Sequence, residues 1–263
     1  MRYVEFAPSA RLAAVVERYW ILEGPGSGLP EPVVPDGRTE LIFHYGAPFR
    51  RHLEDGTVEA QPAAIVAGQI TGPVVLSHRL PAGVAAIRLR PAAARAVLGV
   101  PASELTGRLE PAAAIARDAP SLCDRLAEAA DDAARIALLE RWLSSRVRAL
   151  PRPDVDAAVA AILATGGTAT VGRLTALTGL GRRQLERAFR HEVGIPPKAL
   201  GRIVRFQRAV RLVRRGRPLN EVAAASGFYD QAHLALDFRR LALGPPSAWQ
   251  QREDAIGVLL AGG

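Results

Sequence analysis

A turn followed by an amphipathic helix occurs twice in the last third of the chain, and this repeat limits the possible folds more than any other feature. The later copy covers residues 227–240, where Leu234, Phe238 and, just beyond, Leu241 recur at helical spacing and form an apolar stripe. The earlier copy covers residues 179–190. Two such copies predict a pair of helix–turn–helix units, the motif that places a recognition helix in the major groove of DNA.

The spacing between the copies supports a repeated unit. Leu174 precedes Val222 by 48 positions, and Leu185 precedes Leu234 by 49, so the second turn is expected to be one residue longer than the first. Capping and periodicity predict helices over residues 154–165, 171–178, 182–193, 197–215, 219–226 and 230–241, and a short turn near residue 247.

The sequence Leu-Pro-Arg-Pro at residues 150–153 predicts a domain boundary, because two prolines cannot lie inside a helix. Asp154 is expected to be the N-cap of the helix that follows. Upstream, short apolar runs between Gly and Pro predict strands over residues 40–45, 64–67, 73–78 and 84–90, after a short helix over 12–19. We therefore expect an α+β multidomain protein. It should comprise a β-rich sensing domain, barrel-like or sandwich-like, over residues 1–95, a helical segment over 96–150 and an all-α DNA-binding domain over 151–255.

The helical segment contains a short predicted helix over residues 92–98 and one or two longer helices over 121–148. Its apolar stripe consists of Leu122, Leu126, Ala129, Ala133, Ile136, Leu143 and Val147. Such a stripe suits packing against the chain's own β-rich domain, and it also suits a homodimer interface. The sequence leaves both alternatives open.

The net positive charge is confined to one part of the chain. Residues 1–150 hold 17 Lys and Arg against 17 Asp and Glu, whereas residues 151–263 hold 17 against 9, which accounts for the whole net charge of +8. Localised positive charge attracts polyanions and speeds their capture, so the last domain is expected to bind nucleic acid. The alternative is a basic domain with no polyanionic partner.

The first predicted recognition helix has opposed charged and apolar faces. Leu185 and Phe189 belong to the apolar stripe, whereas Arg187 lies opposite them. The residues expected to face DNA are Arg182, Arg183, Gln184, Glu186, Arg187 and Arg190. Arginine can bind guanine O6 and N7 with two hydrogen bonds. The alternative is a solvated face with an ion pair between Glu186 and Arg190.

The second predicted recognition helix has a less charged face. Its candidate DNA-binding residues are Gln231, Ala232, His233, Leu236, Arg239 and Arg240. Gln231 and His233 can hydrogen-bond bases, and the two arginines can hold phosphates. Leu236 suits contact with a thymine methyl group, or else indicates that this unit reads little sequence. The helix between the units, with arginines at 202, 205, 208 and 211 on its surface, would be roughly 27 Å long, near the roughly 34 Å between successive major grooves.

These residues resemble the AraC/XylS family of bacterial transcription regulators. The resemblance covers roughly residues 155–250. It rests on the sequence Leu-Glu-Arg-Ala-Phe-Arg at 185–190, Gly194, Arg205, Ala209, Val222-Ala223, Gly227-Phe228, Asp230-Gln231, His233 and Phe238. It implies two helix–turn–helix units joined by one helix, with Arg183, Glu186 and Arg187 near bases in one groove and Gln231, Ala232, His233 and Leu236 in the next.

Four positions depart from the family's pattern. Thr175 stands where alanine is usual, and Gly181 replaces the usual serine N-cap, which weakens that helix start by a few tenths of a kcal/mol. Leu236 replaces a common arginine, and Leu243 replaces the glycine that usually ends the second recognition helix. The last two changes put base reading by the second unit in question.

The N-terminal part is similar to an uncharacterised domain that is often fused to such regulators. The similarity rests on Tyr19-Trp20, Val-Pro-Asp-Gly at 34–37, Glu-Leu-Ile-Phe at 40–43 and Arg90-Pro91. Candidate effector-binding residues are Trp20, Glu40, Phe43, His44, Tyr45 and His78, which could line a cavity for a small organic molecule. Trp20 and Phe43 could equally be core residues. A metal site built from His44, His52 and His78 is the weakest alternative, because no close His-x-His pair supports it.

The sequence lacks the common signatures of catalysis: a phosphate-binding glycine loop with its lysine, His-Glu-x-x-His and Gly-x-Ser-x-Gly. We therefore expect a cytoplasmic regulator, not an enzyme, with no cofactor and no membrane segment. Its expected partners are promoter or operator DNA, a small effector, RNA polymerase and a second copy of the chain. The competing hypothesis is a ligand- or metal-binding barrel whose degenerate DNA-binding domain serves as an interaction module.

Overall fold

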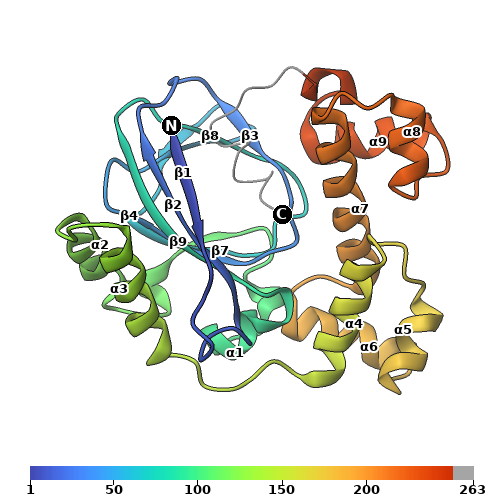
Figure 1. Ribbon diagram of the computed structural model, residues 1–263, viewed down its shortest axis with the longest axis horizontal. Coiled ribbons are helices and arrows are strands. Elements are labelled where there is room, and N and C mark those ends of the chain that lie inside the picture. The colour runs from blue at the N-terminus through green and yellow to red at the C-terminus, as the bar shows by residue number, and fades with distance from the viewer. Residues whose placement is uncertain (251–263) are drawn as a thin grey trace.

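The computed structural model describes residues 1–250 and contains two parts that lie side by side (Figure 1). The N-terminal part holds two sheets, with strand orders β1-β2-β9-β4-β7-β10 and β3-β8-β5-β6. Their strand pairings are antiparallel. The C-terminal part consists of helices arranged along α7 (Pro197–Arg214). The expected combination of a β-rich domain and a helical double helix–turn–helix domain is confirmed.

The strands are β1 (Arg2–Phe6), β2 (Val16–Gly24), β3 (Glu31–Val33), β4 (Glu40–His44), β5 (Arg50–His52), β6 (Val58–Ala60), β7 (Ala64–Ala67), β8 (Val74–Ser77), β9 (Ala82–Leu89) and β10 (Leu109–Pro111). The helices are α1 (Ala94–Leu98), α2 (Ala119–Ala127), α3 (Asp132–Ser144), α4 (Pro153–Ala164), α5 (Val171–Thr178), α6 (Arg182–Glu192), α7, α8 (Leu219–Ala225) and α9 (Gln231–Ala242). Short 3₁₀ turns are η1 (Pro91–Ala93), η2 (Ala102–Glu104), η3 (Ala112–Ala114) and η4 (Pro246–Trp249).

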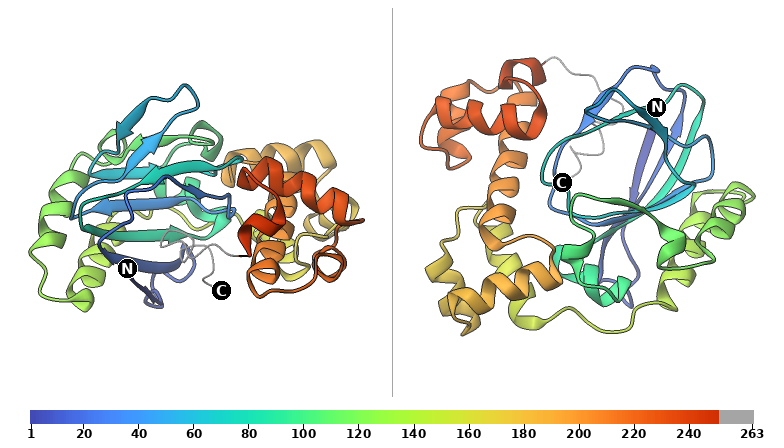
Figure 2. Two further views of the ribbon diagram at one scale, coloured as in Figure 1. Left: turned by 90° about the horizontal axis from the view of Figure 1, so that it is seen from above. Right: turned by 180° about the vertical axis from the view of Figure 1, so that it is seen from behind.

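The six-stranded sheet is covered on both faces. In β2, Tyr19 and Ile21 pack with the helices, whereas Trp20 and Leu22 pack between the two sheets. Successive side chains of a strand point to opposite faces, so a strand covered on both sides is apolar at nearly every position. The views of Figure 2 place α2 and α3, in green, on the side of the sheets away from the C-terminal helices.

The apolar stripe of residues 121–148 packs against the chain's own sheet. Leu122, Leu126 and Leu143 are buried in the same cluster as Phe43 of β4, and Ile136 is partly buried against it. The segment forms two helices, α2 and α3, rather than one. The first of the two alternatives for this stripe is therefore confirmed.

Two local predictions are wrong. The predicted helix over residues 12–19 is a turn followed by β2, because the β-branched and aromatic residues from Val16 onward favour a strand that is buried on both faces. Asp154 is not the N-cap of α4: Arg152 occupies that position, Pro153 is the first helical residue, and Asp154 lies in the first turn, paired with Arg152. Proline is favoured at that first position because it needs no hydrogen-bond acceptor for its nitrogen.

The helices of the C-terminal part begin and end close to their predicted positions, and α5 coincides with its prediction. Two apolar clusters form there, one for each helix–turn–helix unit. The cluster of the first unit includes Leu185 and Phe189, and that of the second includes Leu234 and Phe238. Helix α7 contributes side chains to both, so it fixes the two units to one axis.

Each C-terminal cluster also takes in a residue from the N-terminal part. Ala92 of η1 is buried with the first unit, and Val34, just after β3, is buried with the second. Thr106 donates a hydrogen bond to the carbonyl of Gly194 after α6 (Oγ1 to O, 2.9 Å). The two parts therefore share packed contacts at both ends of α7.

Candidate DNA-binding surface and effector cavity

The first helix–turn–helix unit, called head 1 below, consists of α5 and α6. Thr170 caps α5 by accepting a hydrogen bond from the backbone of Arg173 (3.2 Å), and Gly179 turns the chain with a φ of 69°. Gly181 is the N-cap of α6, and its N–H donates to Oε1 of Gln184 (3.0 Å). These local contacts set where α6 begins, and hence which side chains leave its outer face.

The outer face of α6 carries arginine. Arg183, Arg187 and Arg190 are exposed, at spacings of 4 and 3, while Leu185 and Phe189 are buried on the opposite side. Arg182 and Gln184 are exposed as well, and Glu186 is partly buried. The ion pair between Glu186 and Arg190, which the alternative of a solvated face invoked, does not form, because Glu186 pairs with Arg182 (3.3 Å). Arg190 is therefore not paired with Glu186, and it lies with Arg187 on the exposed face of α6.

The second unit, called head 2 below, consists of α8 and α9. Asp230 caps α9, with Oδ1 accepting from the backbone N–H of His233 (2.7 Å). Leu234 and Phe238 are buried. The candidate residues exposed on α9 are Gln231, Ala232, Leu236, Arg239 and Arg240. His233 is only partly exposed, because its ring packs edge-on against Phe228 (centroids 5.2 Å apart).

Two further features distinguish head 2, of which the sequence pointed only to Leu243. Tyr229, directly before the N-cap, is 93% exposed and so adds an aromatic side chain next to the candidate face. Leu243 ends α9 in the left-handed region with φ 55°, the only such non-glycine residue within residues 1–250. A glycine would adopt that conformation without the steric cost of a Cβ atom.

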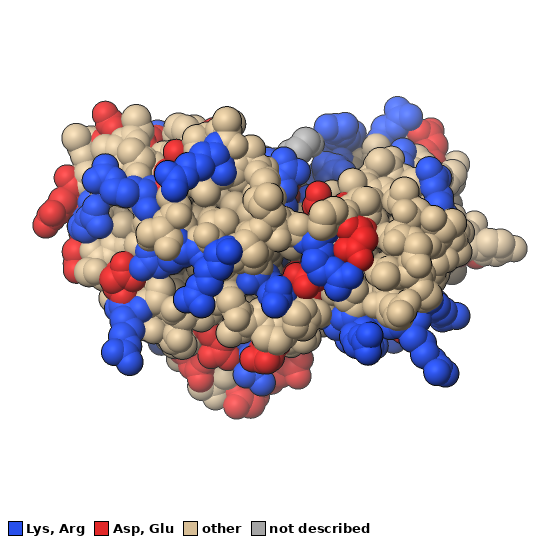
Figure 3. All heavy atoms as spheres, turned by 90° about the horizontal axis from the view of Figure 1, so that it is seen from below, with Lys and Arg blue, Asp and Glu red and all other residues tan. Residues whose placement is uncertain are grey.

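The arginines of α7 do not all decorate its surface as predicted. Arg202 donates from Nε to Oδ1 of buried Asp237 in α9 (2.9 Å), and Arg205 lies over the ring of Phe228 (5.6 Å). Both therefore hold α7 to head 2, and of the four only Arg208 is fully exposed. Figure 3 shows the molecule from below. Arginine and lysine side chains, in blue, project from its right-hand part, where the C-terminal helices lie.

The N-terminal part contains a cavity of about 90 Å³ between the two sheets. Trp20, Glu40 and His44, three of the six candidate effector residues, line it. The other three do not: Phe43 lies on the helix side against Trp142, Tyr45 donates a hydrogen bond to Glu23, and His78 stacks on Phe49. For Phe43 the reason is strand alternation, since Ile42 and His44 of β4 point inward and Phe43 points outward.

One end of this cavity is polar. Arg88 of β9, which sequence reasoning missed, donates from Nε to Oε1 of Glu40 (2.7 Å) and lies 3.4 Å from Asp36. Trp20 Nε1 donates to the same Glu40 oxygen (3.0 Å). Burial raises the pKa of Glu40, against the opposing effect of the Arg88 guanidinium. Trp20 comes from β2 and Arg88 from β9, so only strand pairing brings them to Glu40 of β4.

The opposite end of the cavity holds His44, whose Nε2 is 3.1 Å from Oε1 of Gln61. Burial lowers the pKa of His44 to about 4, so its ring is neutral at physiological pH.

His52, another candidate metal ligand, bonds to Ser77 Oγ (2.7 Å). Within residues 1–250 no group of three or more His, Cys, Asp and Glu side chains is placed to hold a metal ion. No helix in the same range is long and apolar enough to span a membrane.

Comparisons with known proteins agree with this architecture. A family described as a helix-turn-helix domain matches residues 174–252, and a domain of unknown function, DUF6597, matches residues 4–111. No curated protein matches the chain.

Among solved structures, a probable AraC family transcriptional regulator from Rhodopseudomonas palustris is 31% identical, over 39% of this chain and 99% of that one, with a TM-score of 0.36. ToxT from Vibrio cholerae O395 is 10% identical, over 88% of this chain and 96% of its own, with a TM-score of 0.50. An apo ToxT variant from Vibrio cholerae strain SCE256 is 9% identical, over 88% of this chain and 96% of its own, with a TM-score of 0.51. The two ToxT likenesses concern the fold alone.

A double helix–turn–helix domain with a basic outer face defines a DNA-binding transcription regulator. The chain belongs to the AraC family of these regulators.

Proposed function

We propose that the protein binds an operator through both heads and that head 1 carries most of the sequence specificity. The observation that carries this proposal is the exposed row of Arg183, Arg187 and Arg190 on α6, opposite buried Leu185 and Phe189. Arginine is the side chain best suited to guanine in the major groove. On α9, Gln231, Ala232, His233 and Leu236 contact the next groove, and Arg239 and Arg240 hold phosphates.

The N-terminal part makes the binding responsive to a small effector. Support comes from the cavity between the sheets, which has an apolar wall and a polar end, the usual composition of a small-molecule site. The family membership favours a regulator over an enzyme.

The experiment is DNA binding by the full chain across a salt series, with footprinting over the DNA that flanks its own gene. Contacts to phosphate release counterions, so log K should fall linearly with log salt, and a defined footprint should appear. Affinity independent of salt, together with no footprint, would contradict the proposal and favour an interaction module. RNA polymerase and a second copy of the chain are further partners that we propose, and addition of polymerase to the footprinting reaction tests the first of them.

A further inference from the structure

The cavity between the sheets has a wall of mainly apolar side chains. Those that close it from both sheets are Ile42, Phe49, Ile65, Val74, Leu76 and Val84. Its volume of about 90 Å³ has room for several water molecules and is smaller than the roughly 150 Å³ cavity that accepts benzene in an engineered protein. A ligand of this cavity is therefore no larger than about one ring.

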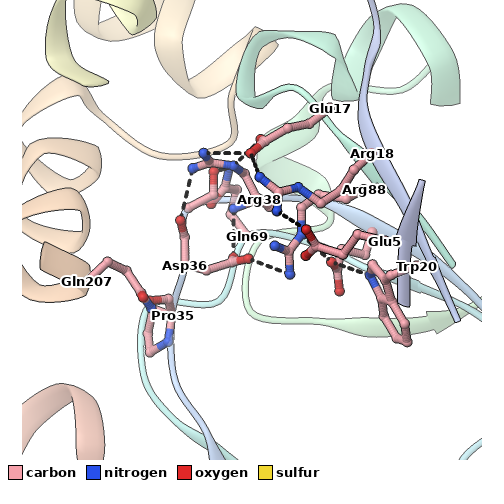
Figure 4. A network of polar contacts seen from close by, with 12 residues as sticks. Glu5, Glu17, Arg18, Trp20, Pro35, Asp36, Arg38, Gln69, Arg88 and Gln207 are labelled. Carbon is pink, nitrogen blue, oxygen red and sulfur yellow. Dashed lines mark hydrogen bonds and ion pairs between the residues drawn. The ribbon is translucent and has the colours of Figure 1, made fainter. Parts of the chain in front are cut away.

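The charged side chains that line the cavity are two carboxylates, Asp36 and Glu40, and two guanidinium groups, Arg38 and Arg88, so their formal charges cancel. Arg88 faces the carboxylates of Glu40 and Asp36, and Arg38 pairs with Glu17 (Nη2 to Oε1, 3.2 Å). These contacts form one continuous network, which Figure 4 shows from close by. His44 at the other end adds no charge, because burial lowers its pKa to about 4. An ionic ligand would lose its hydration here without gaining an unpaired counter-charge, which is costly.

One acceptor remains for a ligand. Trp20 and Arg88 both donate to Oε1 of Glu40, and among the described residues no donor bonds to Oε2. Both Glu40 and Arg88 line the cavity, and the Glu40 side chain is the more exposed of the two, at 16% against 6%. A hydroxyl or N–H group inside the cavity can therefore donate to this carboxylate.

The same cavity touches the segment that enters the DNA-binding part. In residues 34–38, Val34 is buried with the core of head 2, and Nε2 of Gln207 in α7 donates to the carbonyl of Pro35 (2.6 Å). Asp36 and Arg38 of this segment line the cavity. Five consecutive residues thus contact both the ligand space and the helix that joins the two heads (Figure 4).

We propose that the cavity binds a small uncharged molecule with an apolar body and one hydrogen-bond donor, such as an alcohol, and that residues 34–38 transmit its binding to α7. This inference rests on the proposed effector control and names its ligand class and route.

Thermal unfolding of the full chain tests the ligand class without DNA. The probes are cyclopentanol, cyclopentanone, cyclopentylammonium and cyclopentanecarboxylate. Saturating cyclopentanol should raise Tm by about 2–4 °C, because a ligand of the folded state stabilises it. Cyclopentanone, which cannot donate, should act more weakly, and the two ions should have no effect. A larger shift with either ion than with the alcohol would overturn the ligand class.

A cavity-filling variant shows whether the alcohol acts in this cavity. Val74→Phe places a ring at its wall, and Val58→Phe makes the same change on an exposed strand of the same sheet, outside the cavity lining. The Tm shift should disappear in Val74→Phe and persist in Val58→Phe. A shift that persists in both would overturn the site.

DNA affinity tests the route separately. Cyclopentanol should change the operator affinity of the wild-type chain about fivefold or more, a common strength for coupled sites. Gln207→Leu removes the hydrogen bond to Pro35 and should retain the Tm shift while losing most of that change in affinity. An unchanged wild-type affinity despite a full Tm shift would overturn the route, whereas failure to bind DNA at all would count against the proposed function.

Discussion

The two heads share a scaffold but differ at nearly every position that could face DNA. With the offset of 49 residues, Arg183 and Arg187 of head 1 correspond to Ala232 and Leu236 of head 2. The apolar anchors of the two helices correspond without such a change, Leu185 to Leu234 and Phe189 to Phe238. The repeat therefore keeps these apolar anchors while its outer faces differ, and α6 carries four exposed arginines against two on α9.

The heads also differ in how they are held. Head 2 has a side-chain N-cap, Asp230, and a buried carboxylate, Asp237, that binds Arg202 of α7. At the corresponding positions head 1 has Gly181 and Ala188, and it is held instead by contacts with the N-terminal part, such as Thr106 to Gly194. Head 2 is thus tied to α7 by a buried polar contact of its own, whereas the polar contact described for head 1 is with the N-terminal part.

The largest expected effect comes from the anchor of head 2. Asp237→Ala removes the partner of Arg202, which is about one-third exposed, so we expect a loss of about 2–3 kcal/mol in the free energy of unfolding, less than for a fully buried pair. Urea denaturation measures it. Asp237→Asn is the control, since its amide oxygen still accepts from Arg202 and its loss should be smaller. Asparagine keeps the volume and the accepting oxygen but not the charge, so equal losses in the two variants would mean that the carboxylate charge, and not the hydrogen-bond acceptor, holds α9.

Removal of a head 1 arginine should have the next largest effect. Arg187→Ala should weaken specific DNA binding by about 1–3 kcal/mol, roughly 5- to 150-fold, and relax sequence preference. Arg217→Ala removes an exposed arginine that precedes head 2 and pairs with Glu221 of α8. This variant should slightly lower DNA affinity for all sequences. Competition between operator and random duplexes distinguishes the two, and equal losses on both duplexes for both variants would contradict base reading by Arg187.

The end of head 2 should respond in the opposite direction. Leu243→Gly relieves a side chain from the left-handed region, which costs roughly 1–2 kcal/mol there, so the variant should be about 1 kcal/mol more stable. Leu243→Ala retains the Cβ atom and removes the rest of an exposed side chain. If the alanine variant gained as much stability, the backbone conformation would not be the cause.

The smallest effect is expected at the start of head 1. Gly181→Ser should stabilise α6 by a few tenths of a kcal/mol, because serine is a somewhat better N-cap. A Cβ atom at residue 181 would meet only Oε1 of Gln184 at 3.4 Å, so the site has room. Gly181→Ala provides the same Cβ without a hydroxyl and should be slightly destabilising. Thermal melts of the three chains should rank serine, glycine and alanine in that order.

The helices of the two heads could be predicted because their signals are local. Thr170 and Asp230 cap helices through contacts three residues away, and the buried stripe of α9 recurs within twelve residues. The sheets are different. Strands β3, β5 and β6 are three residues long and have no readable alternation. Strands β5 and β6 pair with each other locally, but β3 and β5 meet β8 only by pairing across more than twenty residues. The sequence pattern could not distinguish Phe43, on the helix side, from His44, in the cavity.

The sequence by itself determined the two heads, the location of the positive charge and the exposed arginines of α6, because helix periodicity and capping act within a few residues. Tertiary structure alone decided that Arg88 meets Glu40, that Arg202 meets Asp237 and that Val34 is buried beside α7. The residues in each of these contacts lie tens of residues apart, and Val34 lies more than 160 residues from the start of α7. Their meeting depends on how whole sheets and helices pack, which no short pattern encodes.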